Sequence, residues 1–200
     1  MGVTEHESNT TIMTLAEYLA YDDGTDTRYE LVNGERYPMP SESDLNNLIA
    51  IVLLAEFLKF LPPMHLRRGT ELVTSGTRAT IRIPDLMILT DELITLLSGA
   101  SRSLITLDMP PPVLVIEIAS PGVSNQDRDY RFKRSEYAAR GIEEYWIVDP
   151  TQAKVTLFTL VAGFYEEQIF TKHDRIASPH YPDFSLTVAQ LLQSGNSTGG

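Results

Sequence analysis

The sequence has no cysteine and one tryptophan among its 200 residues. The lack of cysteine excludes a disulfide scaffold, a thiolate nucleophile and any zinc or iron–sulfur site with cysteine ligands. A metal ion would therefore need oxygen or histidine ligands. Histidine is a poor candidate, because the four histidines lack the paired spacing of a zinc site; they are His6, His65, His173 and His180.

Long apolar runs are also absent. The longest run, around 48–54, is followed by Glu56 and Lys59 and is shorter than the roughly 18 residues that a membrane helix needs. The N-terminus has no basic region followed by an apolar block, so we expect no signal peptide and a cytoplasmic location. We expect one domain over residues 1–193 and a disordered Ser/Gly-rich tail over 194–200.

Positive charge is scarce, and the net charge is -11. This balance argues against a protein that coats nucleic acid by bulk electrostatics, because phosphate neutralisation needs Lys and Arg. The basic residues that are present form two segments, which either flank a substrate groove or are ordinary solvated surface. The first segment holds Arg67, Arg68, Arg78 and Arg82, and the second holds Arg128, Arg131, Lys133, Arg134 and Arg140.

The residue pattern predicts a mixed α/β fold. Thr14 and Glu17 form a capping box that starts a short helix, and Asn33-Gly34 is typical of a hairpin turn. A helix from Leu45 to Pro62 is apolar on both sides, which places it either in the centre or at a subunit contact. Further predicted elements are strands over 65–74, 80–89 and 113–119, a short helix capped by Thr90, a helix over 127–140, a strand over 145–148, a hairpin over 155–165 and a weak helix over 188–192.

Two carboxylates interrupt the predicted strands. Asp85 follows Ile83-Pro84, and Glu117 lies inside an apolar strand, where an uncompensated charge costs several kcal/mol. If the two strands are neighbours in one mixed sheet, the carboxylates converge at one edge. Such a pair suits a hard cation such as magnesium, with manganese as the alternative, and the carbonyl of Ile118 would add a further oxygen.

A helix after the second carboxylate carries a candidate basic residue. Asp129, Lys133 and Tyr137 are spaced by four residues and lie on one helix face. In a metal site, Lys133 would assist the attacking water or stabilise the pentavalent state, and Asp129 would orient its amine. Tyr137 would bound the pocket or bind a phosphate. Spacing alone favours a simpler interpretation, in which Asp129 and Lys133 form a surface pair and Tyr137 packs in the core.

Five motifs occur in order along most of the chain. They are Tyr29-Glu30-Leu31-Val32-Asn33-Gly34-Glu35, Ile83-Pro84-Asp85, Val115-Ile116-Glu117-Ile118-Ala119-Ser120-Pro121, the stretch from Lys133 through Tyr137 to Gly141, and Glu144-Tyr145-Trp146-Ile147-Val148-Asp149. Together they resemble the Uma family, bacterial proteins classed as restriction endonucleases within the PD-(D/E)XK nuclease superfamily. The resemblance covers roughly residues 14–184. Each motif alone is weak, whereas the ordered set is specific.

The resemblance implies a restriction-endonuclease-like core over about 28–150, with additional N-terminal and C-terminal hairpins. It also implies metal-dependent cleavage of DNA and frequently a homodimer. Residue by residue, Asp85 and Glu117 match the family's metal ligands, and Glu30 matches its early acidic residue, which is either a water-mediated metal contact or an exposed strand residue.

The sequence departs from the superfamily pattern at two places. The usual lysine would stand at position 119, which is Ala119 here, and Lys133 matches the basic residue that the family carries on the following helix. Relatives often have a histidine at the start of the earlier helix, where this chain has Asn46 and Asn47. No role of that histidine transfers to this chain.

We therefore expect a magnesium-dependent DNA endonuclease with Asp85, Glu117 and Lys133 at its centre. Two alternatives remain at this stage. In the first, the chain is a nuclease-fold protein that no longer cleaves and serves as a DNA-binding or oligomeric module. In the second, it hydrolyses another phosphoester. The acidic net charge favours these alternatives slightly.

Overall fold

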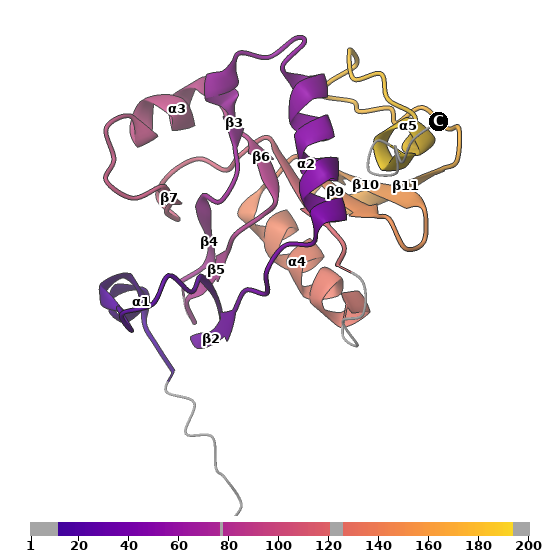
Figure 1. Cartoon of the computed structure of the whole chain (residues 1–200). Coiled ribbons are helices and arrows are strands. Elements are labelled where there is room, and N and C mark those ends of the chain that lie inside the picture. Colours follow the sequence, from indigo (N-terminus) through magenta and orange to yellow (C-terminus); the bar gives the residue numbers. More distant parts are fainter. Residues whose placement is uncertain (1–11, 77, 121–125, 194–200) are drawn as a thin grey trace, which may run out of the picture.

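The computed structural model describes residues 12–76, 78–120 and 126–193, with only the backbone of 126–129. The predicted tail from Ser194 onwards lies outside these residues. The part around α1 (Leu15–Ala20), β1 (Tyr29–Val32) and β2 (Glu35–Pro38) lies at one end of the molecule (Figure 1). The C-terminal hairpin and α5 (Val188–Gln193) lie toward the other end.

A five-stranded mixed sheet forms the N-terminal part of the fold. Its order is β2-β1-β5-β4-β7, and only the contact between β4 and β7 is parallel. The predicted hairpin is confirmed, since Asn33 and Gly34 take positive φ angles of 53° and 86° at its turn. The strands are β1 (Tyr29–Val32), β2 (Glu35–Pro38), β4 (Glu71–Ser75), β5 (Thr80–Arg82) and β7 (Leu104–Ile105).

A six-stranded mixed sheet forms the rest. Its order is β11-β10-β9-β8-β6-β3, and only β8 and β9 run parallel. The parallel pair results from the predicted β-α-β unit, because the helix after β8 carries the chain back to the start of β9. The strands are β3 (Leu66–Arg67), β6 (Leu86–Ile88), β8 (Leu114–Ile118), β9 (Glu144–Asp149), β10 (Lys154–Val161) and β11 (Phe164–Thr171).

Helices cover both faces of the six-stranded sheet. On one face, α2 and α5 pack over the apolar side chains of β8, β9 and β10. On the other face lie α3 and α4, while α1 packs on the five-stranded sheet. The helices are α1 (Leu15–Ala20), α2 (Asp44–Phe57), α3 (Asp91–Leu97), α4 (Gln126–Arg140) and α5 (Val188–Gln193), and a 3-10 turn covers Pro63–His65.

The alternation of side chains along β8 decides which residues meet α4. Leu114, Ile116 and Ile118 belong to the core beneath α2, whereas Val115 belongs to the core beneath α4. Successive residues of a strand point to opposite faces, so Glu117 faces the same side as Val115. The one acidic residue of this strand is thereby directed at helix α4.

Two predicted strands are wrong in extent. The strand expected over 80–89 is split into β5 and β6, which belong to different sheets. Pro84 lies in the break, where its lack of an N–H and its fixed φ favour an end to strand pairing. The strand expected over 65–74 is split in the same way into β3 and β4, with Gly69 at a φ of 70° between them.

Smaller differences concern element ends. Helix α2 ends at Phe57, five residues before the Pro62-Pro63 pair that was expected to stop it, and the short β7 was not predicted. In the three described ranges, no helix has the length and apolar character needed to cross a membrane. Two mixed sheets flanked by helices confirm the predicted α/β class.

Candidate functional site

Glu117 is the centre of a buried polar cluster. Its side chain is 8% exposed, and both of its oxygens accept hydrogen bonds from helix α4. Lys133 Nζ lies 3.0 Å from Oε2, and the hydroxyl of Tyr137 lies 2.6 Å from Oε1. The spacing of four residues on α4 places both donors over the same strand residue, as the helix period requires.

Asp85 lies beside Glu117. It directly precedes β6, whose Leu86 pairs with Ile116 of β8, so continuing this register by one residue sets Asp85 opposite Glu117. Oδ2 of Asp85 accepts a hydrogen bond from the backbone N–H of Ile118 at 2.6 Å. The expected neighbourhood of the two carboxylates is therefore present, although Asp85 lies in the link between two sheets rather than within a strand.

Glu30 reaches the cluster from the other sheet. Its Oε1 lies 3.8 Å from Lys133 Nζ and accepts the N–H of Ile83 at 3.1 Å. Its Oε2 lies 2.9 Å from Nη1 of Arg82. Glu30 is 14% exposed, so it is not an exposed strand residue, which was one of the two alternatives from the sequence.

Arg82 and Glu136 complete the cluster, and the sequence did not single them out for this role. Nε and Nη2 of Arg82 bind the two oxygens of Glu136 at 2.8 and 2.9 Å, and the Arg82 side chain is only 1% exposed. Glu136 lies one helical turn after Lys133. Strand β5 is thus joined to helix α4 beside the lysine.

Burial and neighbouring charges shift the pKa values of the side chains in the cluster. Burial raises the pKa of Glu117 to about 7, against the opposing effect of Lys133. Burial also raises the pKa of Asp85. For Glu30, burial opposes ionisation, but the charges of Lys133 and Arg82 outweigh it and lower its pKa. Burial likewise raises the pKa of Tyr137 well above its usual value, so its hydroxyl stays a donor.

The formal charges of the cluster do not balance. When ionised, its four carboxylates carry a charge of -4 against +2 from two cations, which leaves -2 among groups that are largely withdrawn from water. Buried charge of one sign is unfavourable, and either a bound cation or the protonation of an acid such as Glu117 relieves it. The carboxylates are Glu30, Asp85, Glu117 and Glu136, and the cations are Arg82 and Lys133.

The donors available to an ion are all oxygens. Asp85, Glu117 and Ile118 line the same cleft, and carboxylate and carbonyl oxygens are a set that fits a hard divalent cation. Within 12–76, 78–120 and 126–193, no group of three acidic or histidine side chains is placed to hold a metal together. Water would therefore have to supply much of the coordination, as is common for magnesium.

Asn46, near the start of helix α2, lies next to the cluster. It is 2% exposed, and its amide nitrogen lies 3.4 Å from the carbonyl oxygen of Ile118 and 3.2 Å from the hydroxyl of Ser120. Its buried Oδ1 has no hydrogen-bond partner among the described residues. An unsatisfied buried oxygen next to the Ile118 carbonyl is a further polar group that a hydrated ion would satisfy.

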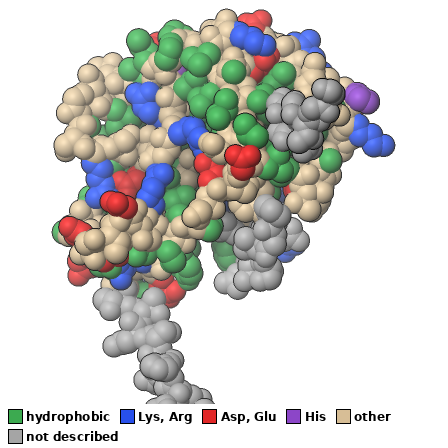
Figure 2. Space-filling model, viewed as in Figure 1, with side chains coloured by type: hydrophobic (Ala, Val, Ile, Leu, Met, Phe, Trp, Pro, Cys, Tyr) green, Lys and Arg blue, Asp and Glu red, His purple; other side chains and the backbone are tan. Residues whose placement is uncertain are grey.

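The cluster opens into a cleft of about 1430 Å³. On the face drawn in Figure 2, acidic and basic side chains lie next to one another near the centre. Of the predicted basic segments, Arg82 and Lys133 are buried in the cluster, and Arg68 and Arg78 line the cleft with them. Arg140 instead binds backbone carbonyls. Some residues of the two basic segments therefore line the cleft, and others hold the fold together. The side chain of Asp129, the expected partner of Lys133, lies outside the described residues.

Comparison with known proteins gives one family match and a match to a solved structure. Residues 15–189 match the model of the family Uma2, described as "Putative restriction endonuclease". A solved structure described as "a putative nuclease belonging to DUF820", from Anabaena variabilis ATCC 29413, superposes with a TM-score of 0.73 at 16% identity, covering 92% of this chain and 99% of that one. No curated protein matches the chain.

At this identity, the structural match shows that the two chains share a fold. The family match shows which family the chain belongs to, since it spans most of the sequence and includes all the residues of the buried cluster. Both agree with the resemblance that the ordered motifs indicated. The chain belongs to the Uma2 family, whose model carries the description "Putative restriction endonuclease".

Proposed function

We propose that this protein is a magnesium-dependent DNA endonuclease that works in the cytoplasm as a homodimer. The observation that carries the proposal is the uncompensated charge of the buried cluster, which one divalent cation would neutralise. Manganese would serve as well, because both ions accept hard oxygen ligands.

Asp85, Glu117 and the carbonyl of Ile118 would hold the ion. When bound, the ion would acidify a water molecule and stabilise the charge that develops on the phosphodiester. The side chains of the pair are already oriented for this task, Asp85 by the N–H of Ile118 and Glu117 by Tyr137. Tyr137 thus has a supporting role, and Asp129 is proposed to support Lys133 from one turn earlier on α4.

Lys133 would assist the attacking water. Its amine is directed at Glu117 and lies on the cleft side of the cluster, where a phosphate would enter. Glu30 lies close enough to Lys133 to hold the amine in place and to contact the ion through water. Lys133 would therefore take the place of the lysine that is missing at Ala119.

The experiment is cleavage of supercoiled plasmid with Mg²⁺ or Mn²⁺ by the wild type and by Asp85→Asn, Glu117→Gln and Lys133→Met. We expect each variant to lose at least 100-fold in rate, since each removes a charge from the site. Circular dichroism checks folding, and Asp183→Asn, an exposed acid far along the sequence, serves as the control.

Retained cleavage in Lys133→Met, with loss in the other two, would refute the role of the lysine alone. A wild type that neither cleaves DNA nor binds a divalent ion in calorimetry would favour the non-catalytic DNA-binding module. Cleavage of other phosphoesters but not of DNA would instead favour the third alternative.

A further inference from the structure

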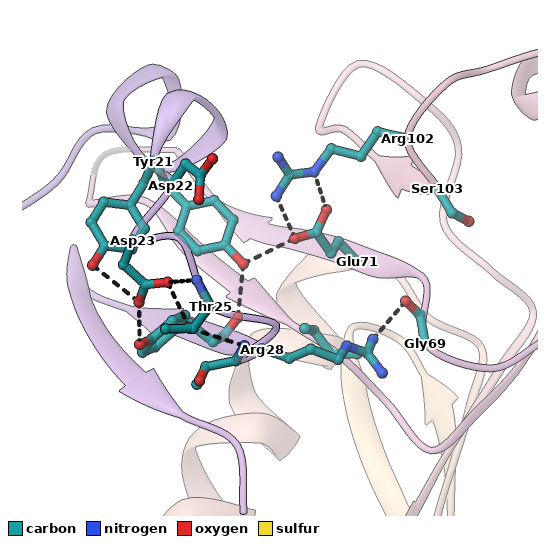
Figure 3. Close-up of a pocket in the computed structure, with 13 residues that line it drawn as sticks. Tyr21, Asp22, Asp23, Thr25, Arg28, Gly69, Glu71, Arg102 and Ser103 are labelled. Atoms are coloured by element: carbon teal, nitrogen blue, oxygen red, sulfur yellow. Dashed lines mark hydrogen bonds and ion pairs between the residues drawn. The ribbon is translucent and has the colours of Figure 1, made fainter.

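A second cavity adjoins the cleft and is not used by the proposed reaction. It has a volume of about 310 Å³ and is lined by the connection between α1 and β1 and by β4 (Figure 3). This volume is at the lower end of the range for small-molecule sites, enough for one nucleobase. We name it the tyrosine pocket after Tyr18, Tyr21 and Tyr29, which line it with Asp22, Asp23 and Glu71.

Arg28 stands at the junction of the tyrosine pocket and the cleft, since it lines both, as do Gly69 and Ile83. Its guanidinium is exposed, and Nη2 donates to the carbonyl of Gly69 at 2.8 Å. A Cβ on Gly69 would lie 3.0 Å from this nitrogen, so the absence of a side chain at position 69 is what admits Arg28. Arg28 is therefore held in place while part of its guanidinium faces open space.

The tyrosine pocket itself repels anions. Among the described residues that line it, three carboxylates stand against two guanidinium groups, those of Arg28 and Arg102, which leaves a formal charge of -1. Glu71 is neutralised by Arg102, whose Nε and Nη2 lie 2.5 and 2.7 Å from its oxygens. A phosphate entering from the cleft would therefore bind at Arg28 and go no deeper.

The carboxylates suit the hydrogen-bond donors of a base. Asp23 accepts from the hydroxyls of Tyr21 and Tyr29, whereas Asp22 accepts only the N–H of Gly24, through Oδ1, at 2.7 Å. Among the described residues, Oδ2 of Asp22 has no hydrogen-bond partner. Carboxylates accept hydrogen bonds from the exocyclic amino groups of bases, and thymine has no such group.

We propose that the tyrosine pocket receives an unpaired base of the substrate strand, whose phosphate binds Arg28 on the way to the cleft. The inference rests on the proposed nuclease function and narrows its substrate to single-stranded or locally unpaired DNA, because a stacked and paired base cannot enter a pocket. Asp22 selects bases that carry an amino group over thymine. The low positive charge of the chain agrees with binding that depends on a base as well as on phosphates.

The test is fluorescence anisotropy of labelled dA, dC and dT 20-mers with Ca²⁺ in place of Mg²⁺, over a series of salt concentrations. The wild type should bind dA and dC at least tenfold more tightly than dT, and Asp22→Asn should abolish that ratio. Arg28→Gln should weaken all three equally and lower the salt slope by about 0.7, the value for one phosphate on a single strand. Asp183→Asn and Arg175→Gln are matched controls, since Arg175 is also exposed and binds a backbone carbonyl through Nη2.

An unchanged base ratio in Asp22→Asn, an unchanged salt slope in Arg28→Gln, or no binding of single strands by the wild type would overturn the inference. Plasmid cleavage by the wild type and by Glu117→Gln separates this result from the proposed function. If cleavage depends on Glu117 but neither pocket variant changes DNA binding, the proposed nuclease function stands and the tyrosine pocket is refuted. If the base ratio is as expected but the wild type cleaves no DNA, the tyrosine pocket stands as a base-binding site and the nuclease function is refuted.

Discussion

Tyr137 shows how much a single hydroxyl contributes to the buried site. Its hydrogen bond to Glu117 is short, at 2.6 Å, and both residues are shielded from water. Bonds to a charged group contribute more than bonds between neutral groups, because the unpaired charge is costly to bury. Tyr165, which is also buried, instead donates to the neutral carbonyl of Ile142 at 2.8 Å.

Tyr137→Phe should therefore lower the free energy of unfolding by about 1.5–3 kcal/mol, and Tyr165→Phe by about 0.5–1.5 kcal/mol. Urea denaturation of the two variants at a pH well above the Glu117 pKa of about 7, where this carboxylate is ionised, measures the difference. Equal losses in both variants would mean that Glu117 gains nothing from the hydroxyl beyond an ordinary hydrogen bond.

Two residues of the candidate site could be singled out for a physical reason, and a third, Lys133, only through the family resemblance. Glu117 interrupts an apolar strand, Asp85 follows a proline at the end of another apolar stretch, and Lys133 matches the family's basic position. Arg82 and Glu136 gave no such signal. An acid on a charge-rich helix looks like solvated surface, and only the packing of α4 against β5 brings it within 2.9 Å of a buried guanidinium.

The ion pair of Arg82 and Glu136 connects strand β5 to helix α4. Removing one partner of a buried ion pair leaves an uncompensated charge, which costs about 3–5 kcal/mol. We expect Glu136→Gln to cost about 3 kcal/mol, the lower end, because Glu30 still faces Arg82. Chemical denaturation measures the loss.

The matched control is Glu167→Gln, which breaks the pair with Arg134. Its side chains are 40% and 41% exposed, and such surface pairs contribute about 0–1 kcal/mol. A loss in Glu136→Gln no larger than that in Glu167→Gln would show that the bond between β5 and α4 does not stabilise the fold.

The turn between β1 and β2 offers a second prediction at this scale. Gly34 and Gly163 share a φ of 86°, but only at Gly34 would a Cβ meet other atoms, at 2.6 Å from Ile12 and 3.1 Å from the carbonyl of Met13. Both alanine variants carry the strain of a positive φ, about 1 kcal/mol, and Gly34→Ala adds the clash. Thermal unfolding should show Gly34→Ala to be the less stable by at least about 1 kcal/mol, and equal stabilities would contradict this.

Element types were easier to predict than element ends. The capping box at Thr14 and the Asn33-Gly34 turn are local signals, and the structure has both features. The break at Pro84 was missed because apolar residues continue on both sides of it, and a run of side chains does not reveal that its halves pair with different sheets. That information lies in partners distant along the chain.

For the molecule as a whole, the unbalanced charge of the cluster predicts that a divalent ion stabilises the fold. Ligand at 100 times its dissociation constant adds about 2.7 kcal/mol, which for a chain of this size raises Tm by roughly 5–10 °C. Scanning calorimetry in Mg²⁺ and in EDTA measures the shift. Glu117→Gln should lose it, while Asp183→Asn keeps it; a shift that persists in Glu117→Gln would place the ion elsewhere.

The division of the fold into two sheets has a consequence for how the site responds to distant change. Glu30 comes from one sheet, Glu117 from the other, and Asp85 sits in the link that crosses between them. The relative positions of these three acids therefore depend on the angle between the sheets, and a bound ion would fix that angle where the sheets meet. Substitutions beneath α1, in the small core around Leu31 and Ile81, would reach the chemistry by tilting one sheet against the other without touching the cleft.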